Sequence, residues 1–324
     1  MNGQRERLVE DAQRTIAAGS KSFRFASQIF DLATRERSWL LYAWCRACDD
    51  ITDGQTLGHD ARTPADPLAR IVFLRDRTNA ALAGEPTGLV PFDALATVAA
   101  ETHIPADLPH DHLAGFARDA AGWTPASEHD LLSYCYQVAG AVGVMMAHVM
   151  GVGPSDRDTL DRASDLGIAF QLANIARDIV DDARVGRSYI PAEWAPGLDP
   201  LDRAQRPRLV EVARRLAALA HRYRRSSKVG AARLPFRSRW AVLSAAAIYG
   251  RVATRAVRLG PRAWDQRISI SKVEKFILVA TAFVEALVPV RNVSRDGLWT
   301  RPHSAHPEPV EGSPSARNPS TSSG

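Results

Sequence analysis

Two pairs of aspartates in this 324-residue chain have a spacing that suits metal and diphosphate chemistry. Asp49 and Asp53 lie in "WCRACDDITDG", and Asp178 and Asp182 lie in "IARDIVDDAR". Residues four apart share one face of a helix, so the carboxylates of each pair point the same way. Like charges one turn apart repel, and burying them unpaired costs roughly several kcal/mol. Mg²⁺ would remove that cost, because it prefers one or two carboxylates together with water and phosphate oxygens.

The second pair continues a polar ladder along an otherwise apolar stretch, "AFQLANIARDIVDD". Gln171 and Asn174 extend the face toward the N-terminus at spacings of three and four residues. The apolar neighbours predict that this face lies inside the protein. A calcium loop in "DDITDGQTLGHD" is excluded, because Ile51 takes the third ligand position and Asp60 the place of the bidentate glutamate. Two facing ladders predict a cluster of Mg²⁺ ions that holds a diphosphate, whereas either pair alone would equally fit a solvated helix end.

Two further stretches suit the two ends of an amphiphilic substrate. In "GSKSF", Ser20, Lys21 and Ser22 precede an expected helix. They could offer hydroxyls, an ammonium group and the free N–H groups of the helix start to an anion. Alternatively, the serine only caps the helix. In "YCYQVAGAVGVMMAHVMG", Gly140 and Gly143 fall inside an expected helix, where each costs about 1 kcal/mol relative to Ala. Such small residues open a long apolar slot or let two helices pack closely. Together with the aspartates, they favour a substrate with a diphosphate head and an apolar tail.

The elements that must position these residues are expected to be helices of one all-α domain, residues 1–300. Pro and Gly collect at breaks such as "RTPADP" and "AEWAPGLDP", and no run alternates as a strand would. Residues 301–324 hold five Pro and six Ser and are predicted to be a disordered tail. The apolar segment 273–290 contains three charged residues, so we expect a buried or interfacial helix rather than a membrane span.

Charge and cysteine content narrow the class of protein. A hydrophobic fraction of 45% and a charged fraction of 24% are typical of a soluble globular protein. Residues 201–270 hold 17 Lys and Arg against three acids, which suits anionic lipid, a phosphorylated substrate or an ordinary solvated surface. Nucleic-acid binding is not expected, because neither interleaved aromatics nor a known module accompanies the arginines. Three cysteines without framework spacing, and a charged N-terminus without an apolar signal region, predict a cytoplasmic protein.

These motifs resemble those of the squalene and phytoene synthase family, above all its bacterial phytoene synthase branch. The most specific are "YCYQVAGAVGVMM" and "LGIAFQLANIARDIVDDARVGRSYIPAEW"; "GSKSF", "LYAWCRACDDITDGQTLG", "DHLAGFARD" and "LWTRP" extend the resemblance to about residue 302. The resemblance implies an isoprenoid synthase-type bundle of helices around a central cavity. The two aspartate motifs would face each other across the mouth of that cavity.

Carried over to this sequence, the resemblance assigns roles to individual residues. The metal ligands would be Asp49, Asp53, Asn174, Asp178 and Asp182. The catalytic set would be the same four aspartates with Tyr134 and Arg177. The diphosphates would be near Ser20, Lys21, Ser22, Arg46, Asn174, Arg177 and Tyr249. The site and the tail channels would be lined by Phe23, Tyr134, Val138, Ala139, Gly143, Met146, Phe170 and Gln171. The cofactor would be Mg²⁺, or else Mn²⁺, and no nicotinamide cofactor is expected.

The reaction implied by the resemblance is the head-to-head condensation of two geranylgeranyl diphosphates. A cyclopropyl diphosphate would form first and then rearrange to phytoene, with Tyr134, Tyr249 or released diphosphate as the proton acceptor. The alternative is a squalene or dehydrosqualene synthase that uses farnesyl diphosphate, since no motif reports the depth of the cavity. A non-catalytic relative could have lost its aspartates, whereas all four are present here. Because the product is extremely apolar, we expect peripheral association with the inner face of the membrane.

Overall fold

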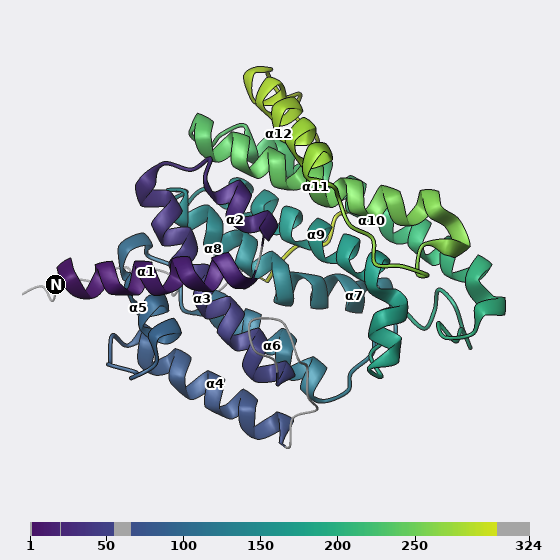
Figure 1. Ribbon diagram of the computed structural model, residues 1–324, viewed down its shortest axis with the longest axis horizontal. Helices are drawn as coiled ribbons and strands as arrows, with labels where there is room; N and C mark the ends of the chain where they lie inside the picture. The colour runs from purple at the N-terminus through teal and green to yellow at the C-terminus, as the bar shows by residue number, and fades with distance from the viewer. Residues whose placement is uncertain (1, 20, 55–65, 303–324) are drawn as a thin grey trace, which may run out of the picture.

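The computed structural model describes residues 2–19, 21–54 and 66–302, and this part of the chain is built from α-helices without a β-strand (Figure 1). The all-α prediction is therefore confirmed. The α-helices are α1 (Asn2–Gly19), α2 (Lys21–Ser27), α3 (Leu32–Asp53), α4 (Pro67–Leu82), α5 (Val90–Thr102), α6 (Asp107–Ala120), α7 (Glu128–Cys135), α8 (Ala141–Val149), α9 (Arg157–Arg184), α10 (Arg206–Ala231), α11 (Phe236–Leu259) and α12 (Lys272–Leu287). Every helix among the described residues is too short or too polar to cross a bilayer.

Helix α9 runs through the middle of the bundle (Figure 1). It packs against α8, α10 and α11, and its buried residues include Ile168, Leu172, Ile175 and Ile179. Burial of these apolar side chains places the middle of α9 in the core. Helix α3 packs in turn against α1, α5 and α8. The two largest apolar clusters of the described residues lie around α9 and α10 and around α3, α5 and α6.

The sequence sets both ends of α3. The Asp31 side chain accepts a hydrogen bond from the backbone N–H of Thr34 at 2.9 Å, which caps the start of the helix. The helix ends at Gly54, whose φ of 63° lies in the left-handed region that glycine adopts without strain. Asp49 and Asp53 therefore lie in the last two turns of α3.

Close backbone packing holds α8 against α9. A Cβ atom at Gly143 would lie 2.4 Å from the carbonyl oxygen of Ala163, and one at Gly167 would lie 2.2 Å from the carbonyl oxygen of Ala139. Both distances are far inside van der Waals contact, so these positions require glycine. The chain before α8 forms a π-helical turn (Tyr136–Gly140), a feature often found at functional sites. The glycine-rich stretch thus provides close helix packing.

Buried ion pairs fix the C-terminal segment to α9. The Asp165 carboxylate, whose side chain is 0% exposed, accepts hydrogen bonds from Arg295 Nε at 2.8 Å and from the Ser226 hydroxyl at 2.6 Å. Arg301 Nε donates to Asp161 at 2.7 Å. Arg301 thus contacts the helical domain, although the sequence assigned it to the tail. The rest of that assignment stays a prediction, because residues 303–324 lie outside the described residues.

Replacing Arg295 with Met should lower the free energy of unfolding by about 3–5 kcal/mol, because Asp165 stays buried without its cationic partner. Arg214→Met is the control, since Arg214 and its partner Glu211 have side chains 55% and 69% exposed. Such a surface pair contributes about 0–1 kcal/mol. Chemical denaturation followed by circular dichroism measures both variants. Equal losses of stability in the two would contradict a structural role for the buried pair.

Candidate active site

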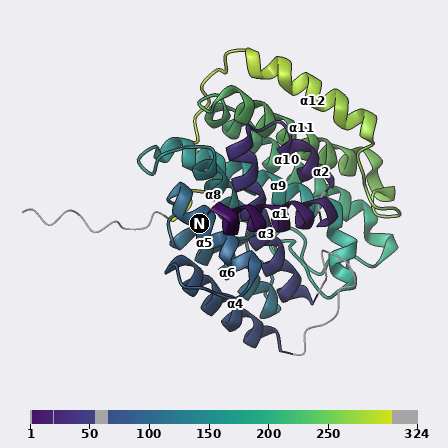
Figure 2. The ribbon, with the colours of Figure 1, turned by 60° about the vertical axis from the view of Figure 1, so that its left-hand side comes forward.

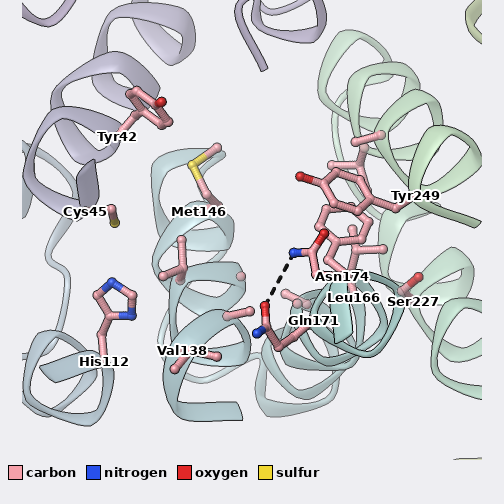
Figure 3. A pocket seen from close by; sticks show the side chains of 18 of the residues that line it. Tyr42, Cys45, His112, Val138, Met146, Leu166, Gln171, Asn174, Ser227 and Tyr249 are labelled. Atoms are coloured by element: carbon pink, nitrogen blue, oxygen red, sulfur yellow. Dashed lines mark hydrogen bonds between the residues drawn. The ribbon is translucent and has the colours of Figure 1, made fainter. Parts of the chain in front are cut away.

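A cavity of about 700 Å³ lies between the two largest apolar clusters. Residues of α3, α6, α8, α9 and α11 line it, and Figure 3 shows Tyr42, Met146, Asn174 and Tyr249 converging on it from different helices. Along α3 the lining residues change from largely apolar to charged toward the C-terminal end of the helix, and along α9 the same change follows the apolar stretch that begins at Ala163. The cavity therefore has an apolar part and a charged end.

Both predicted aspartate pairs line the charged end of this cavity. Asp49 and Asp53 lie in the last turns of α3, and Asp178 and Asp182 lie in the last turns of α9. The C-terminal end of a helix carries a partial negative charge, so four carboxylates at two such ends are electrostatically unfavourable. Arg187, which follows α9, partly compensates this by donating to Asp53 Oδ1 at 2.5 Å. That bond also joins the end of α3 to the chain that follows α9.

Burial, together with the crowded negative charge, raises the pKa of two of these carboxyls. Burial raises the pKa of Asp49 to about 6, with Arg46 opposing the rise and Asp53 adding to it. Burial raises the pKa of Asp182 to about 7, and the neighbouring Asp178 adds to the effect. Both carboxyls thus bind a proton more readily than an exposed aspartate does. A cation at this end of the cavity would stabilise their ionised forms.

Two further arginines neutralise part of the charge within the protein. Arg46 Nη2 lies 2.9 Å from Asp49 Oδ2, and Arg46 also pairs with Asp50. Arg177 Nε donates to Asp178 at 2.7 Å. Among the described residues no group of three or more His, Cys, Asp or Glu side chains is placed to hold an ion by itself. The donor set therefore fits a hard cation that takes one or two carboxylates and completes its shell with water or phosphate oxygens.

The structure adds three residues that sequence reasoning did not assign: Asp119, Arg187 and Tyr189. Asp119 of α6 lines the cavity and accepts hydrogen bonds from the hydroxyls of Tyr134 at 2.9 Å and Tyr189 at 3.0 Å. The two tyrosine rings stack with centroids 4.8 Å apart. Burial raises the pKa of Asp119 to about 6, although Arg187 and the two hydroxyls oppose the rise. The signal was present, since Asp119 ends "DHLAGFARD" and the other two lie in "GRSYIP".

Several predicted lining residues meet at the cavity. Phe170 of α9 and Tyr249 of α11 stack with ring centroids 4.1 Å apart, so the motif around Tyr249 is brought to the site by α11. Asn174 donates a hydrogen bond to Gln171 at 3.4 Å (Figure 3). The remaining lining residues that the sequence predicted are Val138, Ala139, Gly143 and Met146.

Four predicted residues before α3 have no described side chain. Ser20 lies outside the described residues. Lys21, Ser22 and Phe23 belong to α2, but their side chains also lie outside the described part of the chain. Their assignment to the diphosphates and the site therefore stays a prediction.

His112 of α6 is a buried titratable group on the apolar part of the cavity wall (Figure 3). Its Nδ1 lies 3.3 Å from the carbonyl oxygen of Gln137, in the π-helical turn before α8. The ring also packs against Trp44 and Phe116, with centroid distances of 5.4 and 4.8 Å. Burial lowers the pKa of the imidazole to about 4, so the ring is neutral near pH 7.

Comparison with known proteins gives one consistent family. A model described as squalene/phytoene synthase matches residues 16–274. The 15-cis-phytoene synthase of Pantoea ananas is 45% identical over 308 residues, which cover 91% of this chain and 98% of the relative. The 15-cis-phytoene synthase of Paracoccus sp. (strain N81106 / MBIC 01143) is 43% identical over 309 residues, covering 92% of this chain and 99% of the relative.

Solved structures share the fold at lower identity. A crystal structure of a dehydrosqualene synthase in complex with ligand has a TM-score of 0.75 at 24% identity, covering 87% of this chain and 98% of that chain. The crystal structure of squalene synthase HpnC from Alicyclobacillus acidocaldarius has a TM-score of 0.70 at 21% identity, covering 79% and 95%. These similarities identify the isoprenoid synthase type of helical bundle predicted from the sequence.

Acid should destabilise the protein partly through His112. The pKa of the ring is about 4 in the folded protein and 6.5 for a free imidazole. The neutral ring therefore contributes stability that is complete above pH 6.5 and is lost as pH falls toward 4, by about 3 kcal/mol. Unfolding free energies across this pH range should fall less steeply in His112→Phe, which keeps an aromatic ring beside Trp44 and Phe116. An unchanged pH slope would contradict this prediction.

Proposed function

The chain belongs to the squalene/phytoene synthase family, and we propose that it is a 15-cis-phytoene synthase that condenses two geranylgeranyl diphosphates head to head. The observation that carries the proposal is a single cavity with two aspartate pairs at its charged end and an apolar wall beyond them. That arrangement suits a substrate with a diphosphate head and a long hydrocarbon tail. The relatives that carry this name align with the chain over almost its whole length.

The metal of the proposed reaction is Mg²⁺, with Mn²⁺ as a substitute. Its ligands would be Asp49, Asp53, Asn174, Asp178 and Asp182, which all line the charged end. The raised pKa values of Asp49 and Asp182 support this assignment, because both carboxyls are desolvated and lie beside another aspartate, so a metal cation would stabilise their ionised forms. When bound, the metal supplies the Lewis acid that neutralises the leaving diphosphate.

The residues of the chain then bind, orient and shield the reacting groups. The guanidinium groups of Arg46, Arg177 and Arg187 line the charged end, where a diphosphate accumulates negative charge on leaving. The stacked rings of Phe170 and Tyr249 line the cavity, where aromatic π-electrons would stabilise the allylic cation that remains. The apolar wall keeps water away from that cation.

The proposed chemistry needs no reductant. The double bond of the second substrate attacks the allylic cation of the first, and loss of a proton gives a cyclopropyl diphosphate. Ionisation of this intermediate, rearrangement and loss of a second proton give phytoene. Two diphosphates and two protons leave in all, so no nicotinamide cofactor is required.

Released diphosphate is the proposed proton acceptor. Sequence reasoning also left Tyr134 and Tyr249 as candidates. Burial raises the pKa of both phenols above its usual value of 10.0, so each is neutral near pH 7. The Tyr134 hydroxyl moreover donates its hydrogen bond to Asp119, which fixes it as a donor. A neutral phenol is a poor base, which supports diphosphate in this role.

The proposed location is the cytoplasm, at the inner face of the membrane. Phytoene is a hydrocarbon that water cannot dissolve, so the product must pass to lipid. The basic residues of segment 201–270 favour anionic headgroups at about 1 kcal/mol for each cation near the surface. Nucleic acid is not a proposed partner.

The first test is to incubate the full-length chain with Mg²⁺ and, separately, geranylgeranyl and farnesyl diphosphate. The expected product is a forty-carbon hydrocarbon with a triene chromophore, formed from the longer substrate and identified by mass and absorption spectrum. Removing the metal with a chelator should stop the reaction, and added Mg²⁺ should restore it. A thirty-carbon product formed only from farnesyl diphosphate would replace the proposal by the squalene or dehydrosqualene synthase alternative.

Asp178→Asn should reduce turnover to below about one-hundredth of wild type, because the amide removes a charge that the metal site requires. Asp181→Asn is the matched control. Asp181 lies on the same turns of α9, but its side chain is 55% exposed and pairs with Arg184 outside the cavity. Product formation is measured for both variants, with helical circular dichroism as the check on folding. Wild-type turnover in Asp178→Asn would refute the metal assignment.

A further inference from the structure

Helix α12 presents an apolar stripe to the solvent. Val273, Phe276, Ile277, Val284 and Leu287 are between 57% and 71% exposed. Their spacing places them on one face of the helix. Both views of the molecule show α12 on the outside of the bundle, lying over α11 (Figures 1 and 2). A surface helix of a protein surrounded by water normally carries polar residues on such a face, so the stripe requires an explanation.

The acidic residues of α12 face the opposite way. Glu274 pairs with Arg251 and Arg255 of α11 at 3.3 and 3.4 Å, and Glu285 pairs with Lys228 of α10. The carboxylates are thus neutralised against the bundle, together with the buried apolar residues of the inner face. The outer stripe is left without negative charge.

Cations border the stripe at both ends. Lys272 precedes Val273 at the start of α12, and Arg291 follows the helix; both are exposed. At the same end as Arg291, Arg239 Nη2 donates to the carbonyl oxygen of Val288 at 2.6 Å. An apolar helix face bordered by basic residues is the pattern of helices that lie in the headgroup region of anionic bilayers.

The inner face of α12 adjoins the wall of the substrate cavity. Val279 of α12 belongs to one apolar cluster with Phe30 and Ala241, and Met146 and Met150 pack against that cluster. All four of these partners also line the cavity. A membrane that received α12 would therefore lie next to the apolar part of the cavity.

A second copy of this chain fits the stripe less well. In a two-fold dimer through α12, antiparallel helices bring Lys272 of one copy to Arg291 of the other, and parallel helices bring like ends together. Either arrangement places cation against cation, while the acids of α12 are already paired within their own chain. Phosphate groups of lipid provide the missing negative charge.

We propose that α12 docks the protein on an anionic bilayer, with Val273, Phe276, Ile277, Val284 and Leu287 inserted among the acyl chains and Lys272 and Arg291 at the lipid phosphates. The docked helix places the apolar part of the cavity beside the membrane that takes up the hydrocarbon product. This role in product transfer rests on the proposed function, whereas the binding of α12 to lipid does not.

The test is co-sedimentation of the full-length chain with vesicles of phosphatidylcholine alone and of phosphatidylcholine and phosphatidylglycerol at three to one. The variant Phe276→Glu/Ile277→Glu places two charges in the stripe. Its control is Leu68→Glu/Val72→Glu on α4, whose side chains are 62% and 57% exposed, at the opposite side of the bundle (Figure 1). We expect the α12 variant to lose at least about tenfold in vesicle partitioning, while the control binds as wild type does.

The charged border has its own test. Lys272→Gln/Arg291→Gln should lower partitioning into the anionic vesicles by about fivefold per charge and leave binding to pure phosphatidylcholine unchanged. Equal binding of wild type and the α12 variant to both vesicles would overturn the proposal. The proposal would also be overturned if light scattering showed that the wild type is a dimer and the α12 variant a monomer, and if the wild type did not bind vesicles.

Activity measured in detergent separates the two proposals. The α12 variant should form hydrocarbon there at the wild-type rate, because its substitutions lie outside the cavity. If the wild type makes no hydrocarbon, but its vesicle binding is lost in the α12 variant, the proposed function alone is refuted. A chain that makes phytoene and binds vesicles equally with and without the α12 substitutions refutes the docking helix alone.

Discussion

Repulsion among four partly buried carboxylates at one end of the cavity is the constraint on which the rest of the structure depends. The fold ends α3 and α9 at the same place, so Asp49, Asp53, Asp178 and Asp182 meet where both helix dipoles are also negative. Arginines offset part of this charge, and the raised pKa of Asp182 shows that the compensation is incomplete. Positive charge placed at this end of the cavity would therefore reduce the repulsion.

The N-terminal half of α9 makes buried contacts that fix the position of its C-terminal end, where Asp178 and Asp182 lie. Asp161 and Asp165 have the same four-residue spacing as Asp178 and Asp182 further along the helix. Arg295 and Arg301, more than a hundred residues away in sequence, close this first pair into a buried network. Glycine contacts press α8 against the middle of α9. Helix α9 thus carries one buried aspartate pair, Asp161 and Asp165, that anchors it through distant arginines, and a second pair, Asp178 and Asp182, that lines the cavity.

Compensated charge and exposed apolar side chains also lie on different faces of α12. Lys228, Arg251 and Arg255 of the basic region 201–270 pair with the inward glutamates of α12, whose outward face is apolar. In water this arrangement costs free energy, because apolar side chains stay hydrated while charged groups are partly removed from solvent. An apolar cluster connects the inner face of α12 to the cavity wall, so a change in the position of α12 would be transmitted to residues that line the cavity.

The sequence by itself determined the helical class, the identity of the aspartate ladders and the family, because helical spacing is local and the motifs are long. It did not distinguish the buried pair from the pair that lines the cavity, because Asp161–Asp165 and Asp178–Asp182 have equal spacing. The buried pair differs in its partners, which are distant in sequence. It gave no role to Asp119, whose environment is made by Tyr134 and Tyr189 from other parts of the chain. It also left residues 273–290 as either a buried or an interfacial helix. Tertiary structure decided these points, because burial and charge compensation depend on which surfaces the fold brings together.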